Sequence, residues 1–203
     1  MDPTPATATP KAARPKPGER RLQILQMLAA MLQEPGGERV TTAALAARLQ
    51  VSEAALYRHF ASKAQMFEGL IEFIESTVFG LINQITSAQE DGLRQLRDII
   101  AMLASFAERN PGMTRVLVGD ALVTEDDRLQ SRINQLVDRI EASLRQSFRV
   151  AVAQGNLPPG TDASARAGIV MAFMLGRWLR FAKSGFKRPP AEALEQQMSA
   201  LVA

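Results

Sequence analysis

Apolar residues recur at intervals of three or four along most of the chain, from about residue 20 to residue 202. This spacing places them on one face of an α-helix. No segment combines strict alternation of apolar and polar residues with an enrichment in β-branched types, which is the pattern of a half-buried strand. The chain is therefore predicted to be all-α, with about nine helices forming a small head and a larger body.

Prolines, glycines and short polar side chains divide this pattern into segments. Glu-Pro-Gly-Gly follows residue 33, Asn-Pro-Gly follows residue 109, and Asn-Leu-Pro-Pro-Gly begins at residue 156. Such runs are typical of helix ends and loops. No fixed-period repeat is visible. The predicted helices are 20–33, 42–49, 53–60, 63–86, 92–109, 111–122, 125–155, 163–182 and 191–202, the seventh capped by Thr124.

Two of these helices are very short and lie only a few residues apart. Thr41 and Ser52 can each cap one of them, because a hydroxyl oxygen accepts a hydrogen bond from a free backbone N–H of the first turn. Val51, Leu56 and Phe60 would anchor the second helix in the core. Helices this short need a third to pack against, and the preceding amphipathic helix supplies it. The arrangement predicts a helix-turn-helix, whose second helix lies in a DNA major groove.

The outward side of the second short helix carries small residues first and aromatic or cationic residues afterwards. Small side chains allow close approach to base edges, while Tyr, Arg and His can reach phosphates. Solvated charges and packing edges would explain the same residue types without DNA. The residues on this side are Ala54, Ala55, Tyr57, Arg58 and His59.

The excess positive charge lies at the same end of the chain. Residues 1–63 hold nine Lys or Arg against five Asp or Glu, whereas the remainder holds fifteen against sixteen, for a net charge of +3. This asymmetry suits contact with phosphates, although an excess of four charges is also within ordinary variation. Residues 1–18 contain five prolines and are predicted to be a disordered basic tail, either a solubilising leader or an arm along DNA.

Composition argues against several other classes of protein. With no cysteine and one histidine, neither a zinc site nor a cysteine nucleophile is expected. No glycine-rich phosphate loop is present, so we expect neither an enzyme nor a cofactor. The chain has no run of about eighteen apolar residues, the length that is needed to span a membrane. The first residues have no apolar core typical of a secretory signal, so a cytoplasmic protein is predicted.

The helix predicted at 163–182 is apolar on almost every side. A helix of this kind must be covered on every side. A body of so few helices cannot supply all the cover, so we expect a second subunit to cover part of it. The chain is therefore predicted to form a homodimer.

The helix-turn-helix residues resemble the TetR family of bacterial DNA-binding proteins. The resemblance implies a three-helix head at residues 19–62 and an all-helical dimerisation and partner-binding body at 63–203 that pairs through its last long helices. The implied partner is double-stranded DNA with a palindromic site, which would be bound by one dimer or by a pair of dimers. The residues that carry the resemblance are Thr41, Leu45, Ala46, Val51, Ser52, Leu56, Tyr57, His59, Phe60 and Lys63.

The resemblance adds roles at particular positions. The hydroxyls of Thr41 and Ser52 would contact phosphates as well as cap helices, and Lys63 at a helix start is unfavourable for the helix dipole but well placed for a phosphate. Arg48 is either a phosphate contact or a solvated charge. The complete set of predicted DNA-binding residues is Thr41, Thr42, Ala43, Arg48, Ser52, Ala54, Ala55, Tyr57, Arg58, His59 and Lys63.

Body segments such as FAERNPGMTRVL and DRLQSRINQLVDRIEASLRQ also resemble one branch of the TetR family. Its members bind scattered chromosomal sites and, when DNA-bound, antagonise the division protein FtsZ over the nucleoid. The resemblance implies a nucleoid-associated protein with an FtsZ groove between helices 63–86 and 92–109. Phe73, Arg109 and Asn110 are the candidate residues, although core packing and helix capping would also explain them.

The chain departs from the family pattern at one turn. Most members have glycine before the Val-Ser pair, whereas this chain has Gln50. A left-handed conformation there would cost about 1 kcal/mol. The alternative function is a ligand-responsive TetR-like repressor with an inducer pocket in the body. Residues of the types that could line such a pocket are more often part of the core, and we favour core packing for them. The pocket residues would be Met102, Phe106, Met113, Met171, Phe173, Met174 and Trp178.

Overall fold

The computed structural model describes residues 18–34, 40–123 and 125–202. These ranges contain nine α-helices and no strand, as the apolar spacing predicts. None of these helices is both long and apolar enough to cross a membrane. The helices are α1 Glu19–Gln33, α2 Thr42–Arg48, α3 Glu53–Tyr57, α4 Lys63–Ala88, α5 Gly92–Arg109, α6 Pro111–Leu117, α7 Asp127–Ala153, α8 Ala163–Lys183 and α9 Leu194–Val202.

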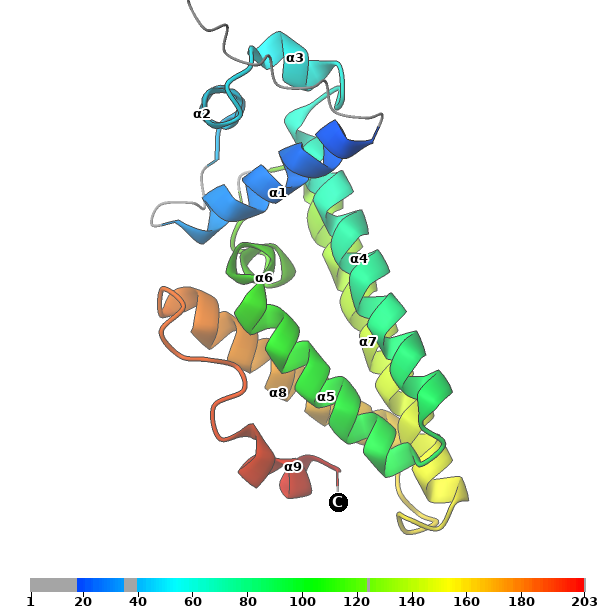
Figure 1. Cartoon of the computed structure of the whole chain (residues 1–203). Helices are drawn as coiled ribbons and strands as arrows, with labels where there is room; N and C mark the ends of the chain where they lie inside the picture. Colours follow the sequence, from blue (N-terminus) through cyan, green and yellow to red (C-terminus); the bar gives the residue numbers. More distant parts are fainter. Residues whose placement is uncertain (1–17, 35–39, 124, 203) are drawn as a thin grey trace, which may run out of the picture.

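The first three helices form the head at one end of the molecule (Figure 1). Ile24, Leu28 and Leu32 of α1 are buried with Leu45 of α2 and Leu56 of α3, so α1 is the third helix that the two short ones require. Helix α1 also packs on α6 of the body. The predicted disordered tail at 1–18 lies outside the described residues except for Gly18.

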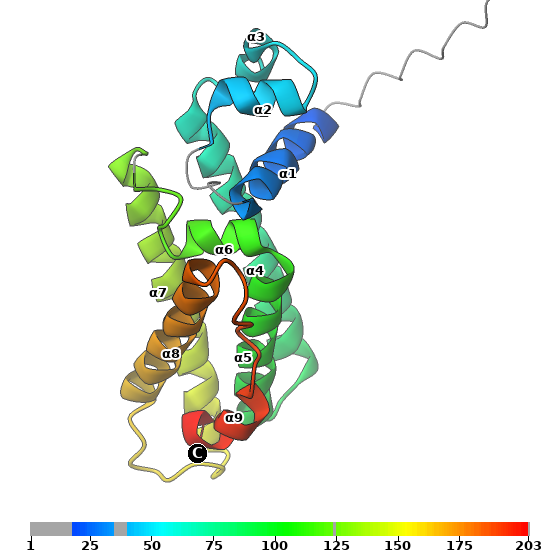
Figure 2. The ribbon, with the colours of Figure 1, turned by 90° about the vertical axis from the view of Figure 1, so that its left-hand side faces the viewer.

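A close helix contact joins head and body. A Cβ atom at Gly112 of α6 would lie 1.9 Å from the carbonyl oxygen of Ala29 in α1, so only glycine allows this approach. The long helix α4 provides the second connection, because it begins in the head and runs beside α7 through the body (Figures 1 and 2). Glu75 of α4 forms ion pairs with Arg132 and Arg139 of α7.

Several predicted helix ends are wrong by a few residues. Helix α3 ends at Tyr57 instead of residue 60, because the N–H groups of His59 and Phe60 both donate to the carbonyl of Leu56 in a closing turn. Helix α6 ends at Leu117, before a left-handed glycine at position 119. Helix α9 begins at residue 194 instead of 191, after a left-handed Ala193.

The predicted cap of α7 is also wrong. The carboxylate of Asp126 accepts from the backbone N–H of Arg128 and caps the helix, whereas Thr124 lies outside the described residues. Two guanidinium nitrogens of Arg128 also donate to this carboxylate. These hydrogen bonds lower the pKa of Asp126 to about 2. Acid residues are favourable at this helix end whichever one caps it.

Helix α8 is buried along one side and exposed along another. Trp178, Met174 and Val170 are fully buried, but Ile169 is 57% exposed and Leu179 is 45% exposed. The chain thus covers α8 incompletely, as expected from its apolar composition. Ala165, Ala172 and Gly176 continue the exposed strip at helical spacing.

Candidate nucleic-acid interface

The two predicted caps form as expected. The hydroxyl oxygen of Thr41 accepts from the N–H of Ala44 at 3.2 Å, and that of Ser52 accepts from the N–H of Ala55 at 3.2 Å. Both side chains are exposed. A hydroxyl that accepts in this way keeps its own proton free to donate, so either group can cap its helix and bind an anionic oxygen at the same time.

The turn between α2 and α3 depends on Gln50, which is left-handed with φ of 54°. Its N–H donates to the carbonyl of Ala47, and the N–H of Val51 donates to that of Ala46. These hydrogen bonds end α2 and start the chain towards α3. A non-glycine residue in this conformation costs about 1 kcal/mol, so the interactions of the head must outweigh the strain.

Helix α3 presents the predicted outward face to solvent. Leu56 and Phe60 are each 1% exposed, whereas Tyr57 is 44% exposed. Ala54 and Arg58 are exposed as well. Ala55 and His59 lie at the edge and are half-buried. The small residues therefore precede the longer polar ones along an accessible helix surface, which suits close approach to base edges.

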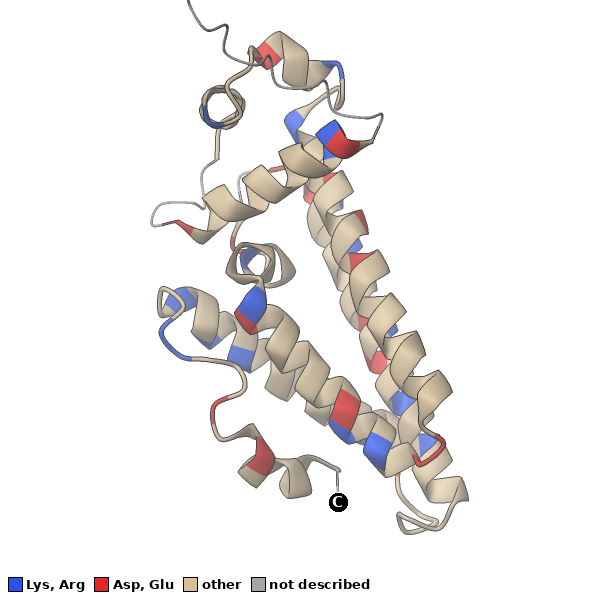
Figure 3. Ribbon diagram, in the orientation of Figure 1, with Lys and Arg blue, Asp and Glu red and all other residues tan. Residues whose placement is uncertain are grey.

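A polar network joins the start of α2 to α3. The hydroxyl of Thr42 donates to the carboxylate of Glu53 at 2.6 Å and accepts from the hydroxyl of Tyr57 at 3.4 Å. Ala43, the next residue of α2, is exposed beside this network. Glu53 is exposed, and its carboxylate disfavours a nearby phosphate. Acidic positions alternate with Lys and Arg positions along the helices of head and body (Figure 3).

Two of the predicted phosphate contacts are held by carboxylates within the chain. Arg48 forms two hydrogen bonds of 2.7 Å with Glu34, which lowers the pKa of the Glu34 carboxyl and raises that of Arg48. Lys63 lies 2.5 Å from Glu125, whose side chain is 9% exposed. The second pair connects the first turn of α4 with the segment that precedes α7.

Arg21 of α1 supports the site, although it is not among the predicted site residues. Its guanidinium donates to the carbonyl of His59 and lies 4.1 Å from the centre of the Phe60 ring. It thereby fixes the chain after α3 against α1. The contact joins residues 38 positions apart, so no local sequence pattern signals it.

Known proteins resemble both parts of the molecule. Residues 24–70 match the family described as bacterial regulatory proteins, tetR family, and residues 90–203 match the SlmA-like family described as tetracyclin repressor-like, C-terminal domain. The nucleoid occlusion factor SlmA of Alteromonas mediterranea is 47% identical over 91% of this chain and 95% of that protein. SlmA of Idiomarina loihiensis is 48% identical over 88% and 91%. The chain belongs to the SlmA family.

Solved structures of TetR-type regulators share the fold. PfmR of Thermus thermophilus superposes with a TM-score of 0.73 at 23% identity, covering 89% of this chain and 97% of that one. FadR of Bacillus halodurans superposes with a TM-score of 0.76 at 14% identity, covering 92% and 96%. This SlmA-family chain therefore has the all-helical TetR fold. Its relatives are named as nucleoid occlusion factors, in agreement with the expectation that it is not an enzyme.

Two of the three candidate partner-binding residues of this SlmA-family chain line one cavity, and Phe73 does not line it. Arg109 is exposed and Asn110 is half-buried, and both line a cavity of about 220 Å³ whose other wall is α1, with Ala29 and Gln33. Phe73 is half-buried on α4 and packs against the core. The described cavity thus lies between α1 and the α5–α6 junction, not between α4 and α5.

The residues considered for an inducer pocket are mostly core. Phe106, Met113, Met171, Met174 and Trp178 are buried. Met102 and Phe173 are half-buried and pack against the core. One body cavity, of about 300 Å³ between α6, α7 and α8, has other lining residues, among them the exposed Leu179. None of the seven residues lines a second body cavity of about 410 Å³ between α4, α5 and α7. Core packing, the favoured interpretation, agrees with this burial.

Proposed function

We propose that this chain is a dimeric, sequence-specific DNA-binding nucleoid occlusion factor that antagonises FtsZ assembly when it is bound to palindromic chromosomal sites. The observation that carries the proposal is the exposed face of α3, presented by a capped helix-turn-helix in a chain of the SlmA family. The names of its relatives supply the biological setting, a nucleoid-associated one.

Each head has the geometry for one half-site. Ala54 and Ala55 at the start of α3 allow the helix backbone to approach base edges, and Tyr57, Arg58 and His59 follow towards the phosphates. The phosphates on the other side meet the start of α2, through Thr41, Thr42 and Ala43. Lys63 and Arg48 join the contact when phosphates replace their carboxylate partners, Glu125 and Glu34.

Dimerisation through α8 follows from its uncovered apolar strip. The exposed strip carries the large apolar side chains of Ile169 and Leu179, and between them Ala172 and Gly176 are small enough for close helix packing. Helix α7 packs beside α8, so two subunits would form a four-helix contact. A two-fold dimer would place its α3 helices about 34–36 Å apart, one turn of DNA.

Selection of bound fragments from sheared chromosomal DNA tests the reading function. We expect a palindrome scattered over the chromosome, outside promoters and sparse near the terminus. Enrichment of one promoter alone would instead support the ligand-responsive repressor. Absence of any bound sequence at low salt would contradict both.

The FtsZ step needs a separate measurement. Light scattering of FtsZ polymers should fall when the protein and its DNA site are added together, and less when either is omitted. An Arg109→Glu variant should bind DNA normally and lose this effect, with Arg94→Glu on the exposed start of α5 as the matched control. Unchanged polymer with the wild-type complex would leave only DNA binding.

A further inference from the structure

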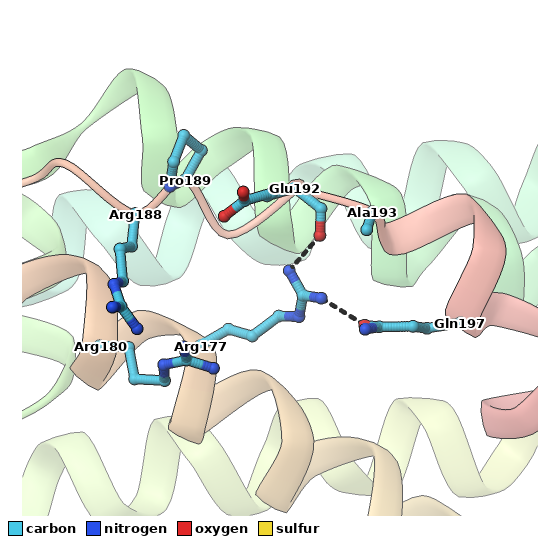
Figure 4. Close-up of a pocket in the computed structure, with 7 residues that line it drawn as sticks. All are labelled: Arg177, Arg180, Arg188, Pro189, Glu192, Ala193 and Gln197. Atoms are coloured by element: carbon cyan, nitrogen blue, oxygen red, sulfur yellow. Dashed lines mark hydrogen bonds between the residues drawn. The ribbon is translucent and has the colours of Figure 1, made fainter.

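A second group of cations lies in the body, at the C-terminal end of α8. Arg177 and Arg180 lie three residues apart on one helix face, and Arg188 reaches them from the segment that connects α8 with α9 (Figure 4). Together they line a cavity of about 190 Å³, which we call the arginine cleft. Its remaining lining residues are Pro189, Glu192, Ala193 and Gln197.

Arg177 forms the floor of the cleft and is bound only to uncharged acceptors among the described residues. Its guanidinium donates to the backbone carbonyls of Pro190 at 2.6 Å and Glu192 at 2.8 Å, and to the side-chain oxygen of Gln197. Burial, and then the positive charge of Arg180, lower the pKa of Arg177. Arg177 thus connects α8 with the segment before α9. Its guanidinium also lies 4.7 Å from the centre of the Phe173 ring, and the charge of Glu192 acts on its pKa in the opposite direction.

The other two arginines face the cleft without partners. Arg180 and Arg188 are exposed, and their guanidinium groups form no hydrogen bond or ion pair with the residues that the structure describes. Glu192 is the single carboxylate that lines the cleft. Among the described residues, it forms no ion pair with any of the three arginines. By contrast, Lys183 on the next turn of α8 pairs with Asp120. Three guanidinium groups therefore face one carboxylate.

The segment that carries Arg188 is held in place by specific contacts. The hydroxyl of Ser184 accepts from the N–H groups of Lys187 and Arg188, both at 3.1 Å. Further along, the N–H of Ala191 donates to the Glu108 carboxylate of α5 at 2.9 Å. These contacts present the arginines on an ordered frame, which reduces the entropy that an anion must overcome on binding.

We propose that the arginine cleft binds a multiply charged phosphate group, such as the diphosphate of a small molecule. Planar guanidinium groups form paired hydrogen bonds with phosphate oxygens, and several of them together match a group with more than one negative charge. The cleft is smaller than the roughly 300–1,000 Å³ of sites that enclose whole ligands. It would therefore hold an anionic end and leave the remainder of the ligand outside.

Isothermal titration with pyrophosphate at constant ionic strength tests the site. We expect binding by the wild-type protein and a loss of about tenfold for each guanidinium removed, hence about a hundredfold for Arg180→Gln with Arg188→Gln. The substituted side chains form no hydrogen bond or ion pair within the described residues, so the thermal unfolding midpoint should not fall. Arg94→Gln, which removes an exposed arginine from α5, should bind as the wild type does.

Two further titrations separate phosphate from general anion binding. ATP should bind with an affinity similar to that of pyrophosphate, because its phosphates supply the same oxygens, whereas citrate should bind at least tenfold more weakly. Equal binding of pyrophosphate by the double variant, equal binding of citrate by the wild type, or no binding by the wild type would each overturn the proposal. The head plays no part in this experiment, so the result is independent of DNA reading.

Discussion

The cations of the head and those of the arginine cleft differ in their partners. Arg48 and Lys63 each have a carboxylate within the chain, at 2.7 and 2.5 Å. Arg180 and Arg188 have none among the described residues, although they are exposed, as Arg48 is. A phosphate that binds Arg48 or Lys63 must therefore displace an existing partner, whereas an anion at the cleft meets cations that are already free.

This difference matters most for a chain whose two parts are proposed to act together. When an ion pair joins two separate segments, its cation can bind a phosphate only if the contact between those segments is lost. The Lys63–Glu125 pair connects α4 with the segment before α7, so DNA binding would release that segment. The Arg48–Glu34 pair lies within the head and is about half exposed on both sides, so its exchange should cost less.

The largest effect on DNA affinity is expected at the start of α3, where the small residues leave room for close approach of the DNA. A carboxylate introduced by Ala54→Glu should reduce DNA affinity by at least about a hundredfold, because like charges brought together at an interface cost several kcal/mol. Ala54 is exposed, so folding should be unaffected. Fluorescence anisotropy with the selected DNA site measures this, and Ala101→Glu on the exposed side of α5 is the control. Unchanged affinity would exclude α3 as the reading helix.

Removal of a paired cation should have a smaller effect. Lys63→Gln should weaken DNA binding by about five- to tenfold and reduce the slope of log K against log salt by about one, as for one lost phosphate contact. Salt titrations of anisotropy check both numbers. Because Lys63→Gln also leaves Glu125 unpaired, the double variant with Glu125→Gln is the matched control. A slope equal to that of the wild type would mean that Lys63 touches no phosphate.

Removal of the carboxylate should act in the opposite direction. Glu125→Gln frees Lys63, and we expect DNA affinity to rise by about two- to fivefold, since the pair is partly buried and its loss removes a competitor of the phosphate. Glu34→Gln should give a smaller rise because its pair is exposed. Anisotropy at about 0.1 M salt distinguishes the two. The reverse order would show that the connection to the body does not restrain the head.

The smallest effect is expected on stability, from Asp126, which caps α7 next to Glu125. The pKa of Asp126 is about 2 in the folded chain against 3.8 ordinarily, so its stabilising contribution is complete above pH 3.8 and is lost as the pH falls towards 2. The thermal unfolding midpoint should thus fall less over this range in Asp126→Asn, which keeps a capping oxygen. Parallel curves for both proteins would contradict the assigned cap.

Much of the fold follows from local chemistry. Apolar spacing predicts the helices, and the Thr41 and Ser52 caps form within hydrogen-bonding distance of the expected N–H groups. Boundaries were less predictable, because a few backbone hydrogen bonds decide where a helix ends. Phe60 shows the distinction: it lies in the core as predicted, although the helix ends before it.

The candidate interface was predicted only in its outward-facing residues. Residue types indicate which side chains of α3 face solvent, but they do not indicate their partners. Glu34 and Glu125 lie 14 and 62 positions from the cations they hold, so both pairs depend on how separate helices pack. The cavity beside Arg109 is lined by α1 instead of α4 for the same reason.

Local interactions, those within three or four residues, can be inferred from the order of the residues. They determine the helices, the caps, the outward face of α3 and the apolar character of α8. The stacking of Arg21 on Phe60 and the ion pairs of Arg48 and Lys63 arise only in the tertiary structure. So does the arginine cleft, because it needs Arg188 to return to α8. Packing sets these distances, and packing depends on the whole chain at once.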